Sequence, residues 1–185
     1  WSIWLRRDIV NIMKFSSYPF FANVYIYILS YLFFSMAKVL IVYGTTSGNT
    51  EWVVTNVAKS LIAGGHEVTT ERCEMSEPSS IPNFDVILLA CPTYNVGKLQ
   101  ENFDEYYKKF ITNKFDGKKF ACIALGDSKL YDIFGGSKDF LEKGVKAVGG
   151  VQILPTLMID GMVYGRETEW ETWGTALGKV INGNT

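Results

Sequence analysis

The sequence is poor in the residues on which most catalytic and metal sites depend. It has a single histidine, His66, which argues against a Ser-His-Asp triad and against a histidine-rich metal site. Three cysteines, Cys73, Cys91 and Cys122, are too widely spaced for a disulfide framework or a metal-ligand pattern. Cys91 and Cys122 lie inside apolar runs and are predicted to be buried thiols. His66 follows two glycines and is predicted to be a solvated loop residue.

An excess of charge of one sign is also absent. The chain has 18 Lys and Arg against 19 Asp and Glu, a net charge of −1, and no basic stripe stands out. This composition argues against a nucleic-acid partner. A length of 185 residues suits one domain with a sizeable core.

Residues 1–35 differ in composition from the rest of the chain. Residues 16–35 carry no charge and are long enough to cross a bilayer, and Arg6, Arg7 and Lys14 precede them as in a signal or anchor sequence. However, the chain begins with Trp1, and Met36 comes just before the first strand-like run. We interpret residues 1–35 as translated upstream sequence with the start at Met36. A hydrophobic signal or anchor segment is the alternative, and only then is a membrane partner expected.

From residue 36 onward, apolar runs alternate with amphipathic segments. Continuous apolar runs predict buried strands at 39–43, 84–91 and 119–126, and weaker patterns predict strands at 67–73 and 151–154, the last resuming at 157–159. Helical spacing predicts four helices, at 50–63, 103–111, 137–148 and 170–181, and composition predicts a loop at 76–83. Such alternation predicts an α/β fold, a doubly wound five-stranded parallel sheet of order 2-1-3-4-5 in a three-layer sandwich.

Three loops should meet where the buried strands end. Residues 44–50, 92–98 and 126–136 leave the carboxyl ends of the three buried strands, and ligands bind at that edge in doubly wound sheets. No nucleophile, general base or metal-ligand pattern stands out in them, so an enzyme is not predicted.

The first of these loops reads Gly-Thr-Thr-Ser-Gly-Asn-Thr and contains no lysine or arginine. A helix N-terminus binds phosphate through free N–H groups and its dipole, while glycines let the backbone approach and hydroxyls add donors. The predicted phosphate-binding residues are Thr45, Thr46, Ser47, Gly48, Asn49 and Thr50. The missing lysine argues against a P-loop NTPase, and the missing GxGxxG argues against a dinucleotide fold. A monophosphate such as that of FMN fits. Simple capping of the helix is the alternative.

The segment "IVYGTTSGNT", residues 41–50, resembles the flavodoxin signature. It matches the aromatic-x-hydroxyl-x-x-Gly-x-Thr pattern through Tyr43, Thr45, Gly48 and Thr50. The resemblance covers residues 36–185 and is of the short-chain type. It implies a flavodoxin-like fold and a cytoplasmic, monomeric, low-potential one-electron carrier with non-covalently bound FMN. Its partners would be redox proteins, a reductase donor and an oxidoreductase acceptor.

The resemblance also assigns roles in the second and third loops. Thr93 would bond the ribityl or phosphate end of FMN, and Tyr94 would stack on the flavin. Asn95 stands where the family usually has glycine, in a peptide that turns to accept from the reduced flavin, so this turn should cost more here. In the third loop, Asp127 would lie near the pyrimidine edge and Tyr131 would supply the second ring. Backbone groups at Gly126, Phe134 and Gly135 would complete the site.

Two clusters of acidic residues also stand out in the sequence, and two other classes of protein share the predicted fold. The acidic residues are Glu101, Asp104 and Glu105, and Glu167, Glu169 and Glu171. They are expected either to steer a basic partner or to stabilise first helical turns. An FMN-dependent NAD(P)H or quinone reductase of the same fold is the alternative function. A receiver-like domain is disfavoured because the acidic residues it needs after the first and third strands are missing.

Overall fold

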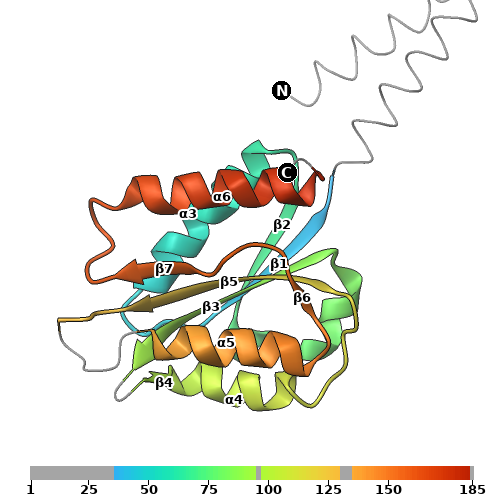
Figure 1. Ribbon diagram of the computed structural model, residues 1–185, viewed down its shortest axis with the longest axis horizontal. Helices are drawn as coiled ribbons and strands as arrows, with labels where there is room; N and C mark the ends of the chain where they lie inside the picture. Colours follow the sequence, from blue (N-terminus) through green and yellow to red (C-terminus); the bar gives the residue numbers. More distant parts are fainter. Residues whose placement is uncertain (1–35, 95–96, 130–134, 184–185) are drawn as a thin grey trace, which may run out of the picture. The chain divides into compact units, whose positions relative to one another are not determined.

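The chain forms a parallel sheet with helices on both of its faces (Figure 1). The computed structural model describes residues 36–94, 97–129 and 135–183. The strands are β1 Lys38–Tyr43, β2 Glu67–Arg72, β3 Val86–Tyr94, β4 Lys98–Leu99, β5 Lys119–Gly126, β6 Val151–Gln152 and β7 Leu157–Asp160. The helices are α3 Asn49–Ala63, α4 Glu101–Phe110, α5 Gly136–Ala147 and α6 Glu167–Ile181, with short 3₁₀ helices η1 Cys73–Met75 and η2 Pro78–Asn83.

The order of the parallel strands confirms the doubly wound prediction. It is β2-β1-β3-β5-β6, and β7 pairs with β5 further along, so two short strands share the fifth position. In register, Val39 of β1 lies opposite Val68 of β2 and Val86 of β3. The two-residue strand β4 pairs antiparallel with the end of β3.

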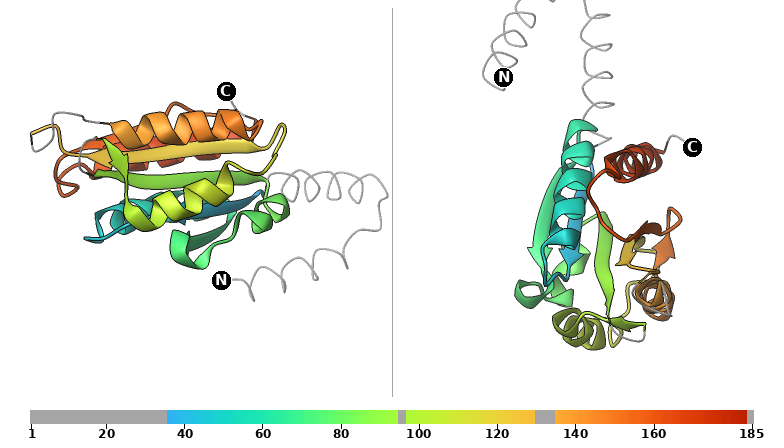
Figure 2. Two further views of the ribbon diagram at one scale, coloured as in Figure 1. Left: turned by 90° about the horizontal axis from the view of Figure 1, so that it is seen from below. Right: turned by 90° about the vertical axis from the view of Figure 1, so that its left-hand side faces the viewer.

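Two apolar layers hold the sandwich together, one on each face of the sheet (Figure 2). Helices α3 and α6 cover one face, where Trp170 is fully buried against the strands. Helices α4 and α5 cover the other face, where Phe103 and Phe110 are fully buried. Each such large apolar side chain contributes on the order of 1.5–3 kcal/mol of burial free energy. The helical spacing of apolar residues therefore identified the helix faces that pack on the sheet.

Three local predictions were wrong. Strand β3 runs on to Tyr94, so residues 92–94 belong to a strand that pairs with β5 and β4 rather than to a loop. Residues 76–83 include the 3₁₀ helix η2 rather than plain loop. The imidazole of His66 is buried instead of solvated, and its Nδ1 accepts from the Ala37 N–H at 3.4 Å. The turn at Gly64 and Gly65 directs this ring under α6 beside Gly178.

Other predictions about composition are confirmed, and one lies outside the described residues. Cys73, Cys91 and Cys122 are free thiols, and all three are buried. Within the ranges that the structure describes, no helix combines the length and the hydropathy needed to cross a bilayer. The interpretation of residues 1–35 concerns residues outside those ranges.

Candidate cofactor-binding site

The three predicted loops come together at the carboxyl ends of the parallel strands. The arrowheads of β3, β5 and β7 point to this edge in Figure 1. A cavity of about 280 Å³ opens there. It is lined by Thr45, Thr46, Ser47, Asn49 and Thr50, by Pro92, Thr93 and Tyr94, and by Leu125, Gly126, Asp127, Gly161 and Met162. The strand order thus joins segments that are about 45 and 80 residues apart in the sequence.

The first loop leads into α3, and no side chain of the described residues caps the N-terminus of this helix. Gly48 is the N-cap residue and has a left-handed backbone with φ 85°, which favours glycine. The hydroxyl of Thr45 accepts from the Gly48 N–H at 3.0 Å and so closes the turn just before the helix. No side chain in the described part accepts from the first-turn N–H groups of α3. Simple capping therefore does not explain the loop, and these donors are available to an anion.

Thr50 supplies the strongest indication of a missing ligand atom. Its side chain lines the cavity and is only 1% exposed. Among the described residues its Oγ1 has no hydrogen-bond partner. A buried hydroxyl without a partner loses its hydration at a cost, so such atoms normally have one. An anionic oxygen at the N-terminus of α3 would satisfy it, and the residues present therefore fit a bound phosphate.

A cationic side chain does contact the first loop, but it belongs to a residue of another strand. Arg72 is the last residue of β2, opposite Tyr43 of β1, and its Nη2 donates to the Thr45 carbonyl oxygen at 3.2 Å. The guanidinium also donates to Glu74 at 3.1 Å and lies 3.9 Å from Glu51. Sequence reasoning missed Arg72 because its role depends on the pairing of β2 with β1. A basic residue closing the neighbouring strand was the available signal.

The carboxylate of Glu74 keeps Arg72 in place. Burial alone would raise the pKa of Glu74, but hydrogen bonds to its carboxylate outweigh burial and lower the pKa to about 2. The donors are its own N–H, the Cys73 thiol at 3.2 Å, Arg72, and the Asn102 amide at 2.7 Å. Glu74 is consequently charged at neutral pH and orients the guanidinium.

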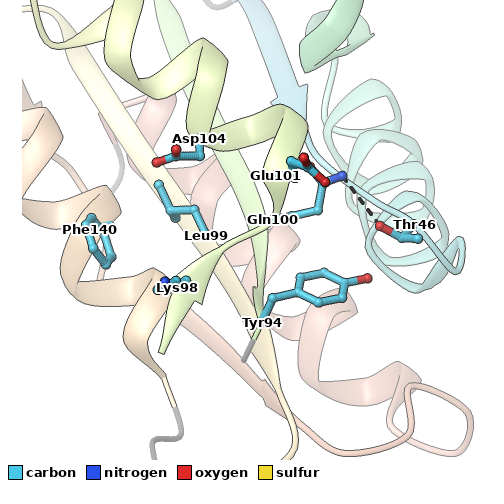
Figure 3. A pocket seen from close by; sticks show the side chains of 8 residues that line it. All are labelled: Thr46, Tyr94, Lys98, Leu99, Gln100, Glu101, Asp104 and Phe140. Carbon is cyan, nitrogen blue, oxygen red and sulfur yellow. Dashed lines mark hydrogen bonds between the residues drawn. The ribbon is translucent and has the colours of Figure 1, made fainter. Parts of the chain in front are cut away.

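Gln100 links the first loop to the second. It is buried at the N-terminus of α4, where its Oε1 accepts from the Phe103 N–H at 2.9 Å and its Nε2 donates to the Thr46 hydroxyl at 3.4 Å (Figure 3). Gly44 makes this approach possible, because a Cβ there would lie 2.8 Å from Gln100 Oε1 and 2.9 Å from Phe103 Cβ. Close packing at the end of β1 therefore requires glycine at position 44.

Tyr94 is the last residue of β3 and lies between two cavities. It lines the cavity described above and also a neighbouring one of about 680 Å³, whose lining includes Lys98, Asp104 and Phe140. In Figure 3 its ring extends from β3 toward Thr46. The ring-stacking role of Tyr94 stays a prediction. Asn95, the next predicted residue, lies outside the described residues.

Thr93 also lines the cavity, but its hydroxyl has a protein partner. It lies 2.8 Å from the Ser137 hydroxyl and accepts from the Ser137 N–H at 3.2 Å. Ser137 is in the first turn of α5, so Thr93 holds the start of α5 against β3. Gly136, just before it, touches Gly97 so closely that a Cβ would overlap the Gly97 backbone.

The third loop is held by an acidic residue at the end of β7. Asp160 accepts from the Ser128 N–H at 2.8 Å and from its hydroxyl at 2.7 Å, and these bonds hold the pKa of Asp160 below its usual range. Asp127 lines the cavity and accepts from the Lys129 N–H at 2.9 Å. Gly135 is the N-cap residue of α5 and has φ 81°. The predicted residues Tyr131 and Phe134 lie outside the described ranges.

A fourth segment, which sequence reasoning missed, completes the cavity. Gly161 and Met162 follow β7, and the Gly161 N–H donates to the Gly126 carbonyl oxygen at 2.7 Å. Only the sheet order could have indicated these two residues, because β7 ends beside β5 at the same edge of the sheet. Within the described ranges, no cluster of three or more potential metal-ligating residues occurs.

Comparison with known proteins decides the family. The flavodoxin family model matches residues 41–173. The chain is 33% identical over 149 residues to a flavodoxin of Nitratidesulfovibrio vulgaris, covering 79% of this chain and 98% of that protein. It is 32% identical over 135 residues to a probable flavodoxin of Bacillus subtilis, covering 72% and 89%. The chain belongs to the flavodoxin family.

Solved flavodoxin structures agree with this assignment. A mutant flavodoxin of Pseudomonas aeruginosa shares 26% identity and a TM-score of 0.71, with 79% of this chain and 99% of that chain covered. The flavodoxin of Fusobacterium nucleatum, solved bound to flavin mononucleotide, has a TM-score of 0.69 at 22% identity, with 78% and 98% covered. Flavodoxins are FMN-carrying electron-transfer proteins rather than enzymes. The predicted class and cofactor are therefore confirmed, and the reductase alternative is not favoured.

Proposed function

We propose that this flavodoxin holds FMN in the cavity at the carboxyl edge of the sheet and carries single electrons at low potential between a reductase and an oxidoreductase. The observation that carries the proposal is the buried, unpartnered hydroxyl of Thr50 at the N-terminus of α3. It lies in the one loop whose sequence matches the family signature. A phosphate at this place is the ligand that satisfies both the hydroxyl and the helix end.

The phosphate end of FMN is assigned to the first loop. Its ligands are backbone N–H groups and hydroxyls of Thr45, Thr46, Ser47, Asn49 and Thr50, which line the cavity. Gly48 shapes the turn, because its N–H already donates to the Thr45 hydroxyl. Arg72 supports them indirectly, since its guanidinium bonds the Thr45 carbonyl and so holds the loop in position. A direct contact of Arg72 with the phosphate is not required for this role.

The ring end of FMN is assigned to the second and third loops. Tyr94 offers an aromatic face, Asp127 a carboxylate, and Gly126 and Gly135 backbone groups. Asn95, Tyr131 and Phe134 are predicted to complete this end. Thr93 acts here as a positioning residue through Ser137. Bound FMN supplies the redox chemistry, and nearby carboxylate and aromatic faces disfavour extra negative charge, which lowers the potential.

The remaining proposals concern the working state of the protein. We propose a monomer in the cytoplasm, a location that suits three buried free thiols. We also propose that residues 36–185 are the FMN-binding domain, and the compact unit formed by residues 37–185 supports this proposal. This unit has about the length of the whole curated relatives, which supports the proposal.

Flavin uptake followed by reductive titration tests the function. The protein freed of flavin should take up one FMN, as measured by quenching of flavin fluorescence. A potentiometric titration should then resolve two separate one-electron steps, with no NADPH oxidation by the isolated protein. Absence of FMN uptake contradicts the proposal. A single two-electron step together with NADPH oxidation supports the reductase alternative instead.

A further inference from the structure

Three large apolar side chains stand exposed beside the cavity. Trp52 on α3 is 46% exposed, and Met162 and Tyr164, between β7 and α6, are 74% and 66% exposed. The Trp52 and Tyr164 ring centroids lie 6.1 Å apart with their planes at 48°. Single exposed apolar residues are ordinary, but these come from two separate segments that meet. Met162 also lines the cavity, so the exposed group is continuous with its rim.

The segment that carries Tyr164 is tethered at both ends. At its start, the Gly161 N–H is bonded to Gly126. At its end, the Gly165 N–H donates to the Glu167 carboxylate at 3.1 Å, and the Arg166 guanidinium donates to the Asp160 carbonyl oxygen. Trp52 is fixed by its place in the first turns of α3. The backbone that carries the two rings is therefore held in place, which reduces the entropy lost when a protein binds them.

The charges around the two rings are predominantly acidic. Glu51 adjoins Trp52 in the chain, and Glu167, Glu169 and Glu171 follow Tyr164 at the start of α6. The two arginines nearby are engaged within the molecule. Arg166 pairs with Glu169 at 2.7 Å, and Arg72 is shared among Glu74, Glu51 and the Thr45 carbonyl. Glu167 and Glu171 have no salt-bridge partner within the described ranges, so the rim has a net negative charge.

We propose that Trp52 and Tyr164 form the centre of a docking surface for a protein whose contact face has an apolar centre and a basic rim. Trp and Tyr are the residues that most often dominate binding energy at the centre of interfaces, and an acidic rim steers a basic face toward them. That the docked protein is a redox partner rests on the proposed function. The location is specific: the surface lies at the α3 and α6 side of the cavity, away from the acidic residues that begin α4.

Binding of a defined basic protein tests the surface. The probe is ferricytochrome c, a basic haem protein, titrated calorimetrically into the 185-residue chain at low ionic strength, with and without FMN. We expect saturable binding that weakens as salt is added. The double variant Trp52→Gln/Tyr164→Ser should raise the Kd at least about fivefold. The control Met75→Gln changes an 83% exposed side chain on η1 and should leave the Kd unchanged. Thermal unfolding of each variant verifies folding.

A charge-reversal pair tests the rim separately. Glu171→Lys should weaken binding of ferricytochrome c and reduce its salt dependence. Glu67→Lys makes the same change in net charge at the start of β2, at the opposite edge of the sheet, and should have a smaller effect on both. Equal effects of the two reversals, or a Kd unaffected by the aromatic double variant, would overturn the proposal, because binding would then follow overall charge alone.

Two further measurements separate this proposal from others. If sedimentation shows that the chain self-associates and that the aromatic double variant abolishes this, the surface joins copies of the chain, and the proposal is overturned. FMN uptake is measured independently for every variant. A chain that takes up no FMN but binds ferricytochrome c through Trp52 and Tyr164 would contradict the proposed function and leave the docking surface supported.

Discussion

The first and third loops are each held by a charged residue that ends a neighbouring strand, but the two charges are opposite. Arg72 at the end of β2 donates to the Thr45 carbonyl in the first loop. Asp160 at the end of β7 accepts from the N–H and hydroxyl of Ser128 in the third loop. The bond to Arg72 thus occupies a carbonyl acceptor of the first loop, whereas the bonds to Asp160 occupy an N–H donor and a hydroxyl donor of the third loop.

This difference explains how one edge of a sheet can hold the two ends of one ligand. An anionic group needs N–H and hydroxyl donors, and the first loop keeps free the hydroxyl of Thr50 and the N–H groups in the first turn of α3. The third loop uses its donors at Ser128 but leaves the cavity-lining carboxylate of Asp127 beside the ring end. Opposite supports therefore divide the cavity into a donor-rich end and an acceptor-rich end.

The largest effect is expected where the third loop leads into α5. In Gly136→Ala a Cβ would overlap the backbone of Gly97, which cannot move aside as a flexible side chain can. We expect a loss of unfolding free energy of about 1–3 kcal/mol, measured by urea denaturation. Gly44→Ala, at the first loop, should cost less because one of the atoms it meets belongs to the Gln100 side chain.

Gly178→Ala is the control for both glycine substitutions. It adds the same methyl group in α6, where the nearest atom, His66 Nε2, lies at an ordinary contact distance of 3.7 Å. It should leave stability unchanged or raise it by up to about 1 kcal/mol through helix propensity. A Gly136→Ala variant as stable as this control would show that the second and third loops are not packed as described.

Removing the support of the first loop should weaken FMN binding more than removing the support of the third loop. Arg72→Gln removes the guanidinium that holds the Thr45 carbonyl, and we expect about a tenfold higher Kd for FMN by fluorescence titration. Lys59→Gln removes the same charge from an exposed site on α3 and is the matched control. Equal changes in the two variants would assign the effect to net charge rather than to loop geometry.

Removing the support of the third loop should affect a different part of the ligand. Asp160→Asn weakens the bonds to Ser128, and we expect a rise of a few fold in the Kd, similar for FMN and for riboflavin, which lacks the phosphate. Arg72→Gln should instead affect FMN more than riboflavin. If both variants discriminated between the two flavins equally, the division of the cavity into two ends would be wrong.

The smallest effect is expected from pH. The pKa of Glu74 is lowered in the folded protein to about 2, so its contribution to stability is present above the unfolded-state pKa of about 4.3 and is lost as pH falls toward 2. Urea denaturation across this range should show a steeper loss for the wild-type chain than for Glu74→Gln. Parallel pH profiles of the two proteins would contradict the role of Glu74 in anchoring Arg72.

Local pattern was sufficient to predict the fold and the first loop. Buried strands and helical stripes appear in the sequence as apolar periodicity, and residues 44–50 carry their chemistry in consecutive positions. Arg72, Asp160, Gly161 and Met162 could not be found in this way. Arg72 and Asp160 support loops that follow other strands, and Gly161 and Met162 line a cavity formed largely by those loops. These roles exist only once the sheet order has brought the strand ends together.

Two of the three local errors have similar causes. His66 follows a glycine turn typical of the surface, but α6, more than 100 residues later, covers it. The apolar run predicted that the strand ends at Cys91, but β3 continues because its pairing with β5 extends to Pro92 and Leu125. Asn95, Tyr131 and Phe134 stay predictions that rest on the family resemblance.

The most direct test of the central claim is the affinity of Thr50→Val for FMN and for riboflavin. The account predicts a Kd for FMN about 10- to 100-fold higher, an unchanged Kd for riboflavin, and undiminished stability without flavin, because valine removes a buried hydroxyl that has no protein partner. Equal weakening of both flavins, or no change in FMN binding, would contradict the assignment of the phosphate to the start of α3.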